Sequence, residues 1–210
     1  MTTPSVLDTP TLHEAAHRLA QADADLAAVL DRRGPPPLWA REAGFATLVH
    51  IILEQQVSLA SARAAFDRLG AALGVVTPGR LLQLDDATLK AIGFSRQKTH
   101  YARLLARAVL DGRLDLERLA EEDDATVKTE LVKLKGIGPW SADIYLLMAL
   151  RRPDAWPSGD LALAVAAQQV KRLPARPAPA DLEALAEAWR PWRAVAARIL
   201  WHHYLSQPRP

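Results

Sequence analysis

The chain of 210 residues contains no cysteine and carries 26 lysine and arginine residues against 24 aspartate and glutamate residues, so its formal net charge is only +2. The missing cysteines exclude a disulfide framework and a cysteine-ligated iron–sulfur cluster, and they favour a reducing compartment such as the cytoplasm. No apolar run approaches the length of a membrane span, and the first ten residues lack the basic and apolar regions of a signal peptide, so we expect neither a membrane partner nor secretion.

The first predicted helix covers Thr11 to Asp31, where leucines and valines at helical spacing indicate one buried face. Within it, His13-Glu14-Ala15-Ala16-His17 fits the HExxH pattern, which on a helix places two histidines on one face as zinc ligands and the glutamate as general base. The pattern is short, and no third ligand follows at the spacing that zinc enzymes use. Solvated histidines are therefore the simpler interpretation, and a zinc hydrolase is an alternative.

Residues 44–73 predict two helices, of which the first is apolar enough to be buried. The break between them reads Gln55-Gln56-Val57-Ser58, and Ser58 is a residue type that caps helices. A capped junction explains this segment without any further function.

A second pair of helices is predicted over residues 81–91 and 95–110, with Arg96 and Lys98 at the start of the second. Charged helix surfaces are usually just solvated, but these two side chains suit phosphate contacts if the ligand is DNA. No strand pattern of useful length appears in the chain, so the fold is predicted to be all-α.

The most informative stretch is residues 134–163. Gly136 and Gly138 end an amphipathic pattern and flank Ile137, which predicts a hairpin with positive φ angles and a backbone open to close approach. Pro139 then restarts a helix whose unpaired N–H groups and positive dipole end suit a phosphate. The prediction is a helix–hairpin–helix with an anion site, although a lone glycine pair between helices is more often only a cap.

A Pro-Ser-Gly-Asp turn follows and leads into another apolar helix from Leu161. Asp160 lies at the expected N-cap of that helix, and capping alone, worth about 1 kcal/mol, explains an aspartate there. The same position also keeps a carboxylate ionised at the helix N-terminus and directs it outward.

Together these residues resemble the helix-hairpin-helix plus Gly-Pro-Asp signature of DNA glycosylases, in the alkylated-base branch typified by DNA-3-methyladenine glycosylase II. The family pattern is Leu-x-Gly-Ile-Gly-x-Trp-Thr-Ala, and roughly two dozen residues later it has Pro-x-x-Asp with a catalytic aspartate. Asp160 follows Gly138 by 22 positions. The matching hairpin positions, with serine in place of threonine, are Leu134, Gly136, Ile137, Gly138, Trp140, Ser141 and Ala142.

The resemblance covers most of the chain from about residue 12 and implies a two-lobed helical fold without the N-terminal β domain of some relatives. Residues 44–112 are expected to form the lobe with the DNA wedge loop. Residues 10–43 and 113–210 are expected to form the lobe with the hairpin and the catalytic aspartate, with the active-site cleft between the lobes.

The resemblance also implies which residues bind DNA. Gln56 is the implied wedge that enters the duplex where the damaged nucleotide leaves. The implied contacts to the DNA backbone are Gly136, Ile137, Gly138, Trp140 and Ser141. No cofactor is expected to be required, but a structural Na⁺ or K⁺ is implied at the backbone carbonyls of Val132, Leu134 and Gly136.

Asp160 is the implied catalytic residue, because a carboxylate stabilises the oxocarbenium-like sugar formed during N-glycosidic bond hydrolysis and can orient or deprotonate the attacking water. Trp140 and Trp201 occupy implied base-pocket positions, and Ile144 and Leu161 replace tyrosines of some relatives, which implies a wider pocket. Glycosylases that also cut the strand have a lysine just after the second glycine. Trp140 stands there instead, so a monofunctional enzyme is expected.

The expected function is therefore base excision repair: release of alkylated bases such as 3-methyladenine from double-stranded DNA, leaving an abasic site. We expect a cytoplasmic monomer, associated with the nucleoid if the source is bacterial. Two alternatives remain open. The first is a non-catalytic helix-hairpin-helix protein that binds damaged DNA and in which Asp160 only caps a helix. The second is a zinc hydrolase that uses His13, Glu14 and His17.

Overall fold

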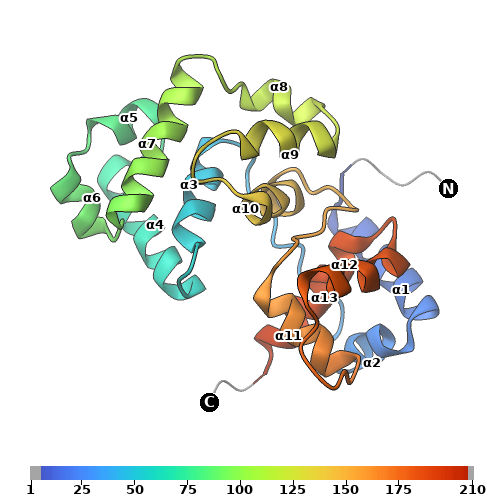
Figure 1. Cartoon of the computed structure of the whole chain (residues 1–210). Coiled ribbons are helices and arrows are strands. Elements are labelled where there is room, and N and C mark those ends of the chain that lie inside the picture. The colour runs from blue at the N-terminus through green and yellow to red at the C-terminus, as the bar shows by residue number, and fades with distance from the viewer. Residues whose placement is uncertain (1–5, 208–210) are drawn as a thin grey trace. The chain divides into compact units, whose positions relative to one another are not determined.

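A computed structural model of the chain describes residues 6–207. Residues 1–5 and 208–210 lie outside this description. The expectation that the chain lacks a signal peptide therefore falls partly on residues that the structure does not describe. Within the described part every regular element is a helix and no strand is present, which confirms the predicted all-α class (Figure 1). Among the same residues, no helix combines the length and the apolar character needed to cross a membrane.

The helices group into two compact units. The inserted unit is the continuous segment Arg41–Tyr145, and the terminal unit combines Met1–Ala40 with Leu146–Pro210. This division differs from the predicted lobes at both boundaries, because residues 41–43 belong to the inserted unit and so do residues 113–145, which contain the hairpin.

The packing of the hairpin helices explains that difference. Helix α9 (Asp124–Val132) packs against α10 (Pro139–Ile144), and α10 packs in turn against α3 (Phe45–Glu54). The hairpin therefore shares the core of the helices that precede it in the chain.

Helix α3 is the centre of the inserted unit. Eight of its ten residues are buried, and it contacts α4, α7 and α10 (Figure 1). Such burial matches its apolar sequence, since a helix that is apolar on all sides needs neighbours on all sides. The other helices of this unit are α4 (Leu59–Leu73), α5 (Pro78–Gln83), α6 (Asp86–Ile92), α7 (Arg96–Leu110) and α8 (Leu116–Glu121).

Helix α13 (Arg193–Leu205) has the same role in the terminal unit. Its residues Ala194 to Trp201 are all buried, and it packs against α1, α2 and α11. Helix α10 of the inserted unit runs directly into a π-helix, η1 (Tyr145–Ala149), whose residues from Leu146 onward belong to the terminal unit. The remaining elements of this unit are α1 (Thr9–Ala22), α2 (Ala24–Arg33), α11 (Leu161–Val170), α12 (Pro179–Ala186) and the 3-10 helix η2 (Glu187–Trp189).

The single helix predicted over Thr11 to Asp31 is wrong, because the chain breaks at Asp23 between α1 and α2. The Asp23 carboxylate accepts hydrogen bonds from the first amides of α2, and it also contacts Lys171 Nζ at 2.6 Å and Trp189 Nε1 at 2.8 Å. A capping aspartate with two distant partners stabilises the break, and the helical pattern of apolar residues on both sides does not reveal it.

Candidate functional site

The predicted helix–hairpin–helix is present between α9 and α10. Gly138 is the N-cap of α10, with Pro139 at the first helical position and no side-chain capping bond at the N-cap. Inside the hairpin, the Ile137 amide donates to the Leu134 carbonyl at 3.0 Å, and the Ile137 side chain is buried. The hairpin thus presents backbone amides at its tip while the isoleucine fixes it to the core.

Gly136 is required by the packing of this hairpin. Its φ is +102°, and a Cβ atom at this position would lie only 2.2 Å from Cγ of Tyr101. The Tyr101 ring on α7 therefore packs directly against the hairpin backbone. Gly138 differs, since its φ is −92° and nothing lies within 4 Å of a Cβ built there.

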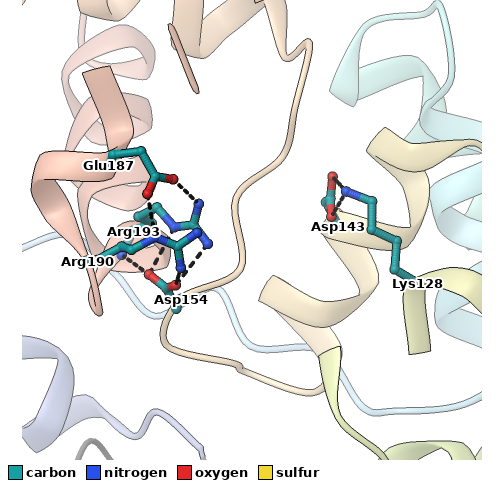
Figure 2. Close-up of polar contacts among 6 residues, drawn as sticks. All are labelled: Lys128, Asp143, Asp154, Glu187, Arg190 and Arg193. Atoms are coloured by element: carbon teal, nitrogen blue, oxygen red, sulfur yellow. Dashed lines mark hydrogen bonds and ion pairs between the residues drawn. The ribbon is translucent and has the colours of Figure 1, made fainter. Parts of the chain in front are cut away.

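An ion pair joins the two helices of the hairpin. Lys128 Nζ on α9 lies 2.8 Å from the carboxylate of Asp143 on α10 (Figure 2). The Asp143 side chain is only 4% exposed, whereas Lys128 is partly exposed. Because a buried carboxylate is stable only with partners, this pair helps to fix the angle between α9 and α10.

The turn between α3 and α4 contains the residue implied as the DNA wedge. Gln56 is exposed and has a φ of +57°, a conformation that residues other than glycine seldom adopt. Ser58 caps α4 by accepting the Ser61 amide, as the sequence predicts. The turn therefore presents the Gln56 side chain at the surface of the inserted unit.

Sequence reasoning missed the role of the preceding residue. Gln55 Nε2 donates to the Gly136 carbonyl at 2.8 Å and to Ser141 Oγ at 3.0 Å, so it ties the α3–α4 turn to the hairpin. No local pattern signals this contact, because its partners lie 81 and 86 positions further along the chain.

The structure gives the two predicted phosphate contacts on α7 different roles. Arg96 is exposed, but Lys98 Nζ donates to the Leu53 carbonyl at 2.7 Å, at the end of α3. Desolvation lowers the pKa of this ammonium from its ordinary value. Through this hydrogen bond Lys98 stabilises the C-terminal end of α3 within the inserted unit.

In the terminal unit, Asp160 is the N-cap of α11, as predicted. Its Oδ1 atom accepts the Leu163 amide at 2.9 Å and the Trp201 indole N–H at 3.2 Å, and the residue is only 9% exposed. The second bond is not part of helix capping. It fixes the carboxylate against α13 and orients the Trp201 ring.

The loop that leads to Asp160 is held by charged side chains. The Asp154 carboxylate accepts bonds from Arg193 Nε at 3.0 Å and Nη2 at 2.8 Å and also from Arg190, and Glu187 pairs with both arginines (Figure 2). Further along the loop, the ring centroids of Trp156 and Trp189 lie 5.8 Å apart. This loop is therefore attached to the segment between α12 and α13 before the chain reaches Asp160.

The residues implied for the base pocket belong to both units. In the inserted unit, Trp140 is half-buried and Ile144 is buried. In the terminal unit, Trp201 is buried beside Asp160, whereas Leu161 is 60% exposed. Of these four, the structure joins Trp201 to the candidate carboxylate by a hydrogen bond.

The HExxH residues lie on α1, with His13 half-buried and Glu14 and His17 exposed. Residues 6–207 contain no group of three or more histidine, cysteine, aspartate or glutamate side chains arranged to hold a metal ion.

Three similarities to known proteins bear on this geometry. The chain is 27% identical over 184 residues to the protein YfjP of Bacillus subtilis, and the match covers 84% of this chain but only 64% of YfjP. It resembles a DNA-3-methyladenine glycosidase from Bacillus halodurans with 28% identity and a TM-score of 0.75, over 91% of this chain and 89% of that one. It also resembles the 3-methyladenine DNA glycosylase Mag1 of Schizosaccharomyces pombe, solved in complex with abasic DNA, with 25% identity and a TM-score of 0.83 over 90% and 95% of the two chains.

A family model covers both the hairpin and Asp160. It describes the HhH-GPD superfamily of base excision DNA repair proteins and matches residues 49–191, which is more than half of the chain. The chain therefore belongs to the HhH-GPD superfamily of base excision DNA repair proteins.

Proposed function

We propose that this protein is a monofunctional DNA glycosylase that hydrolyses the N-glycosidic bond of alkylated bases, such as 3-methyladenine, in double-stranded DNA. The observation that carries the proposal is the buried Asp160 carboxylate, held by the Leu163 amide and the Trp201 indole. The names of the Bacillus halodurans and Schizosaccharomyces pombe relatives support this class of substrate.

Asp160 is the proposed catalytic residue. When the bond between the sugar C1′ and the base breaks, the electron pair leaves with the base and the sugar becomes positively charged. A carboxylate that is already fixed in place stabilises this charge without reorganisation. Water then attacks C1′, and its proton passes to the carboxylate and on to solvent, which leaves an abasic site.

Release of an alkylated purine requires little catalysis beyond this stabilisation of the sugar. Such a purine already carries a positive charge and leaves as a neutral base, so no general acid has to protonate it. The proposed pocket residues are Trp140, Ile144, Leu161 and Trp201, and a cationic base on an indole face gains about 0.5–2 kcal/mol.

The hairpin is the proposed grip on the DNA backbone. Its tip offers the amides of Gly138 and of the first turn of α10, with Ile137 buried beneath, and the contacting residues are proposed to extend to Trp140 and Ser141. Amide-to-phosphate bonds carry no sequence information, which suits an enzyme that searches all sequences for damage. Gln56 is the proposed wedge that fills the space left by the everted nucleotide, and its exposed position supports this.

The cation implied at the hairpin is part of the same proposal. The Leu134 and Gly136 carbonyls each accept one hydrogen bond, from Ile137 and Gln55, and a carbonyl oxygen has a second lone pair. These two oxygens and that of Val132 would hold a Na⁺ or K⁺ ion beside a bound phosphate. We expect duplex affinity to differ between potassium and tetramethylammonium salts of equal ionic strength if this is correct.

We also propose that the protein acts as a monomer in the cytoplasm, and that it does not cut the DNA strand. Trp140 stands where strand-cutting relatives would have their lysine. Borohydride should therefore fail to trap the protein on DNA, and a trapped covalent complex would contradict the monofunctional assignment.

The decisive experiment is incubation with alkylated duplex DNA, followed by chromatography of the released bases, for the wild type and for Asp160→Asn. Release of 3-methyladenine by the wild type alone would support the proposal and the role of the carboxylate. The alternative, a protein that only binds damaged DNA, is favoured by the capping bond that the Leu163 amide donates to the Asp160 carboxylate. It predicts intact DNA binding with no release by either protein.

A further inference from the structure

The side chain of Gln55 contacts the proposed DNA grip from inside the protein. Gln55 is the C-cap of α3 and is half-buried. Its amide nitrogen donates one bond to the Gly136 carbonyl, at the centre of the hairpin, and one to Ser141 Oγ, in the first turn of α10. An amide nitrogen has two hydrogens, so both donors of this side chain are directed at the hairpin.

The next residue in the chain is the proposed wedge. Gln55 and Gln56 share a peptide group, so the position of Gln55 determines where the backbone of Gln56 begins. Gln56 holds a left-handed conformation with φ of +57°, which a residue other than glycine keeps only where its surroundings enforce it. The α3–α4 turn therefore depends on its neighbours for its shape.

Three contacts hold the α3–α4 turn in this conformation. Lys98 Nζ binds the Leu53 carbonyl, Gln55 binds the hairpin, and Ser58 caps α4. Between these anchors Gln56 and Val57 remain exposed, Val57 by 46%. The Gln55 contact differs from the other two, because it joins the turn to the hairpin instead of to α7 or α4.

We propose that Gln55 is a positioning residue that couples the wedge to the DNA grip. When the hairpin binds a phosphate, the two bonds from Gln55 hold Gln56 at a fixed offset from that phosphate, so that it enters the base stack at the damaged nucleotide. Gln55 acts through Gln56 and through the hairpin backbone. This inference rests on the proposed glycosylase function, because it assumes a protein that fills the space left by an everted nucleotide.

The test measures how strongly the protein prefers a gapped base stack. Dissociation constants are measured for an undamaged duplex and for the same duplex with a tetrahydrofuran abasic analogue, with wild type, Gln55→Leu, Gln56→Ala, the double variant and Gln83→Leu. Gln83 is an exposed glutamine on α5 in the same unit and is the matched control.

We expect Gln55→Leu and Gln56→Ala each to lower the preference for the abasic analogue about tenfold, while the affinity for undamaged duplex stays within about threefold. In the double variant, the preference for the abasic analogue should fall no further than in the more strongly affected single variant, because both changes interrupt the same coupling. Gln83→Leu should retain the wild-type preference. If Gln55→Leu does not fold, Gln55→Met replaces it, since it keeps roughly the side-chain length without adding a charge and removes both N–H donors, and the same losses are expected.

Three outcomes would overturn the inference alone: a preference unchanged in the Gln55 variants, an equal loss of affinity for both duplexes, or losses that multiply in the double variant. The second would mean that Gln55 only shapes the hairpin, and the third that it acts independently of Gln56. A wild-type protein without any preference for the abasic analogue would overturn the proposed function itself, and this inference with it.

Discussion

The hairpin of the inserted unit and the loop before Asp160 in the terminal unit are built in opposite ways. The hairpin is mainly backbone, shaped by Gly136, backed by the Tyr101 ring and joined to α3 by an uncharged amide. The loop is held by charged side chains, with Asp154 paired to Arg190 and Arg193. An added side chain should therefore destabilise the hairpin most, whereas the removal of a charged group should destabilise the loop most.

The largest effect is expected for Gly136→Ala. The added methyl group would lie 2.2 Å from Tyr101 Cγ, and the φ of +102° disfavours any side chain. We expect the free energy of unfolding to fall by about 4 kcal/mol, measured by urea denaturation, with loss of duplex binding.

The matched control is Gly138→Ala, where φ is −92° and the space is open. It should lower the free energy of unfolding by less than about 1 kcal/mol. Equal losses in the two variants would show that the Tyr101 contact does not limit the hairpin.

Asp154→Asn tests the charged loop. It leaves Arg190 and Arg193 with Glu187 as their remaining carboxylate partner, and because the Asp154 side chain is 22% exposed we expect a loss of about 2.5 kcal/mol, less than for a fully buried pair. Base release should slow while duplex affinity stays unchanged, because the loop carries Asp160 and the proposed grip lies in the other unit.

Asp111→Asn is the control for that experiment, since Asp111 pairs with Arg113 on an exposed surface. It should behave like the wild type in unfolding and in base release. If Asp154→Asn weakened duplex binding as much as base release, the proposed separation of the two roles would be wrong.

The same contrast explains what the sequence could predict. Gly136, Gly138 and Pro139 specify their hairpin within a few residues, because positive φ and helix starts are local properties, and Asp160 is recognisable as an N-cap for the same reason. The wedge role proposed for Gln56 rests on family resemblance, since the sequence of the α3–α4 turn alone reads as a capped junction.

Contacts between distant segments left no comparable signal. The bonds from Gln55 to Gly136 and from Trp201 to Asp160 each join residues tens of positions apart, and each depends on how helices pack. The helix break at Asp23 was missed for the same reason, because its stabilising partners are Lys171 and Trp189. The division of the chain near residue 145 likewise follows from the packing of α10 on α3.

A smaller effect is expected for Asp23→Asn in the terminal unit. Burial alone would raise the pKa of Asp23, but hydrogen bonds from Lys171 and Trp189 outweigh it and hold the pKa below its ordinary value of 3.8. A lowered pKa in the folded state means that the ionised carboxylate stabilises the protein above pH 3.8 and that this stability is lost as the pH falls further.

At pH 6 the Asp23→Asn variant should be less stable than the wild type by about 2 kcal/mol. The difference should shrink as the pH falls below 3.8, because the wild-type carboxylate is then protonated as well. Melting temperatures of both proteins between pH 3 and pH 7 check this, and a constant difference across the range would contradict the assigned partners.

Two tryptophan substitutions in the terminal unit, each with a modest expected loss of stability, separate an effect on folding from an effect on base release. Trp201 and Trp189 are both buried tryptophans of the terminal unit, and each indole donates to a carboxylate, Trp201 to Asp160 and Trp189 to Asp23. Replacing either by phenylalanine removes the same atoms and one hydrogen bond to a charged group, so each variant should lose about 1.5 kcal/mol of unfolding free energy. Only Trp201→Phe should also slow base release, by about tenfold, because only Trp201 holds the carboxylate proposed to face the sugar and also lines the proposed base pocket. The measurement is the single-turnover rate of base release, compared at equal folded fraction. If both variants slow release equally, the rate follows the general stability of the terminal unit. The Trp201 bond to Asp160 would then have no part in the chemistry.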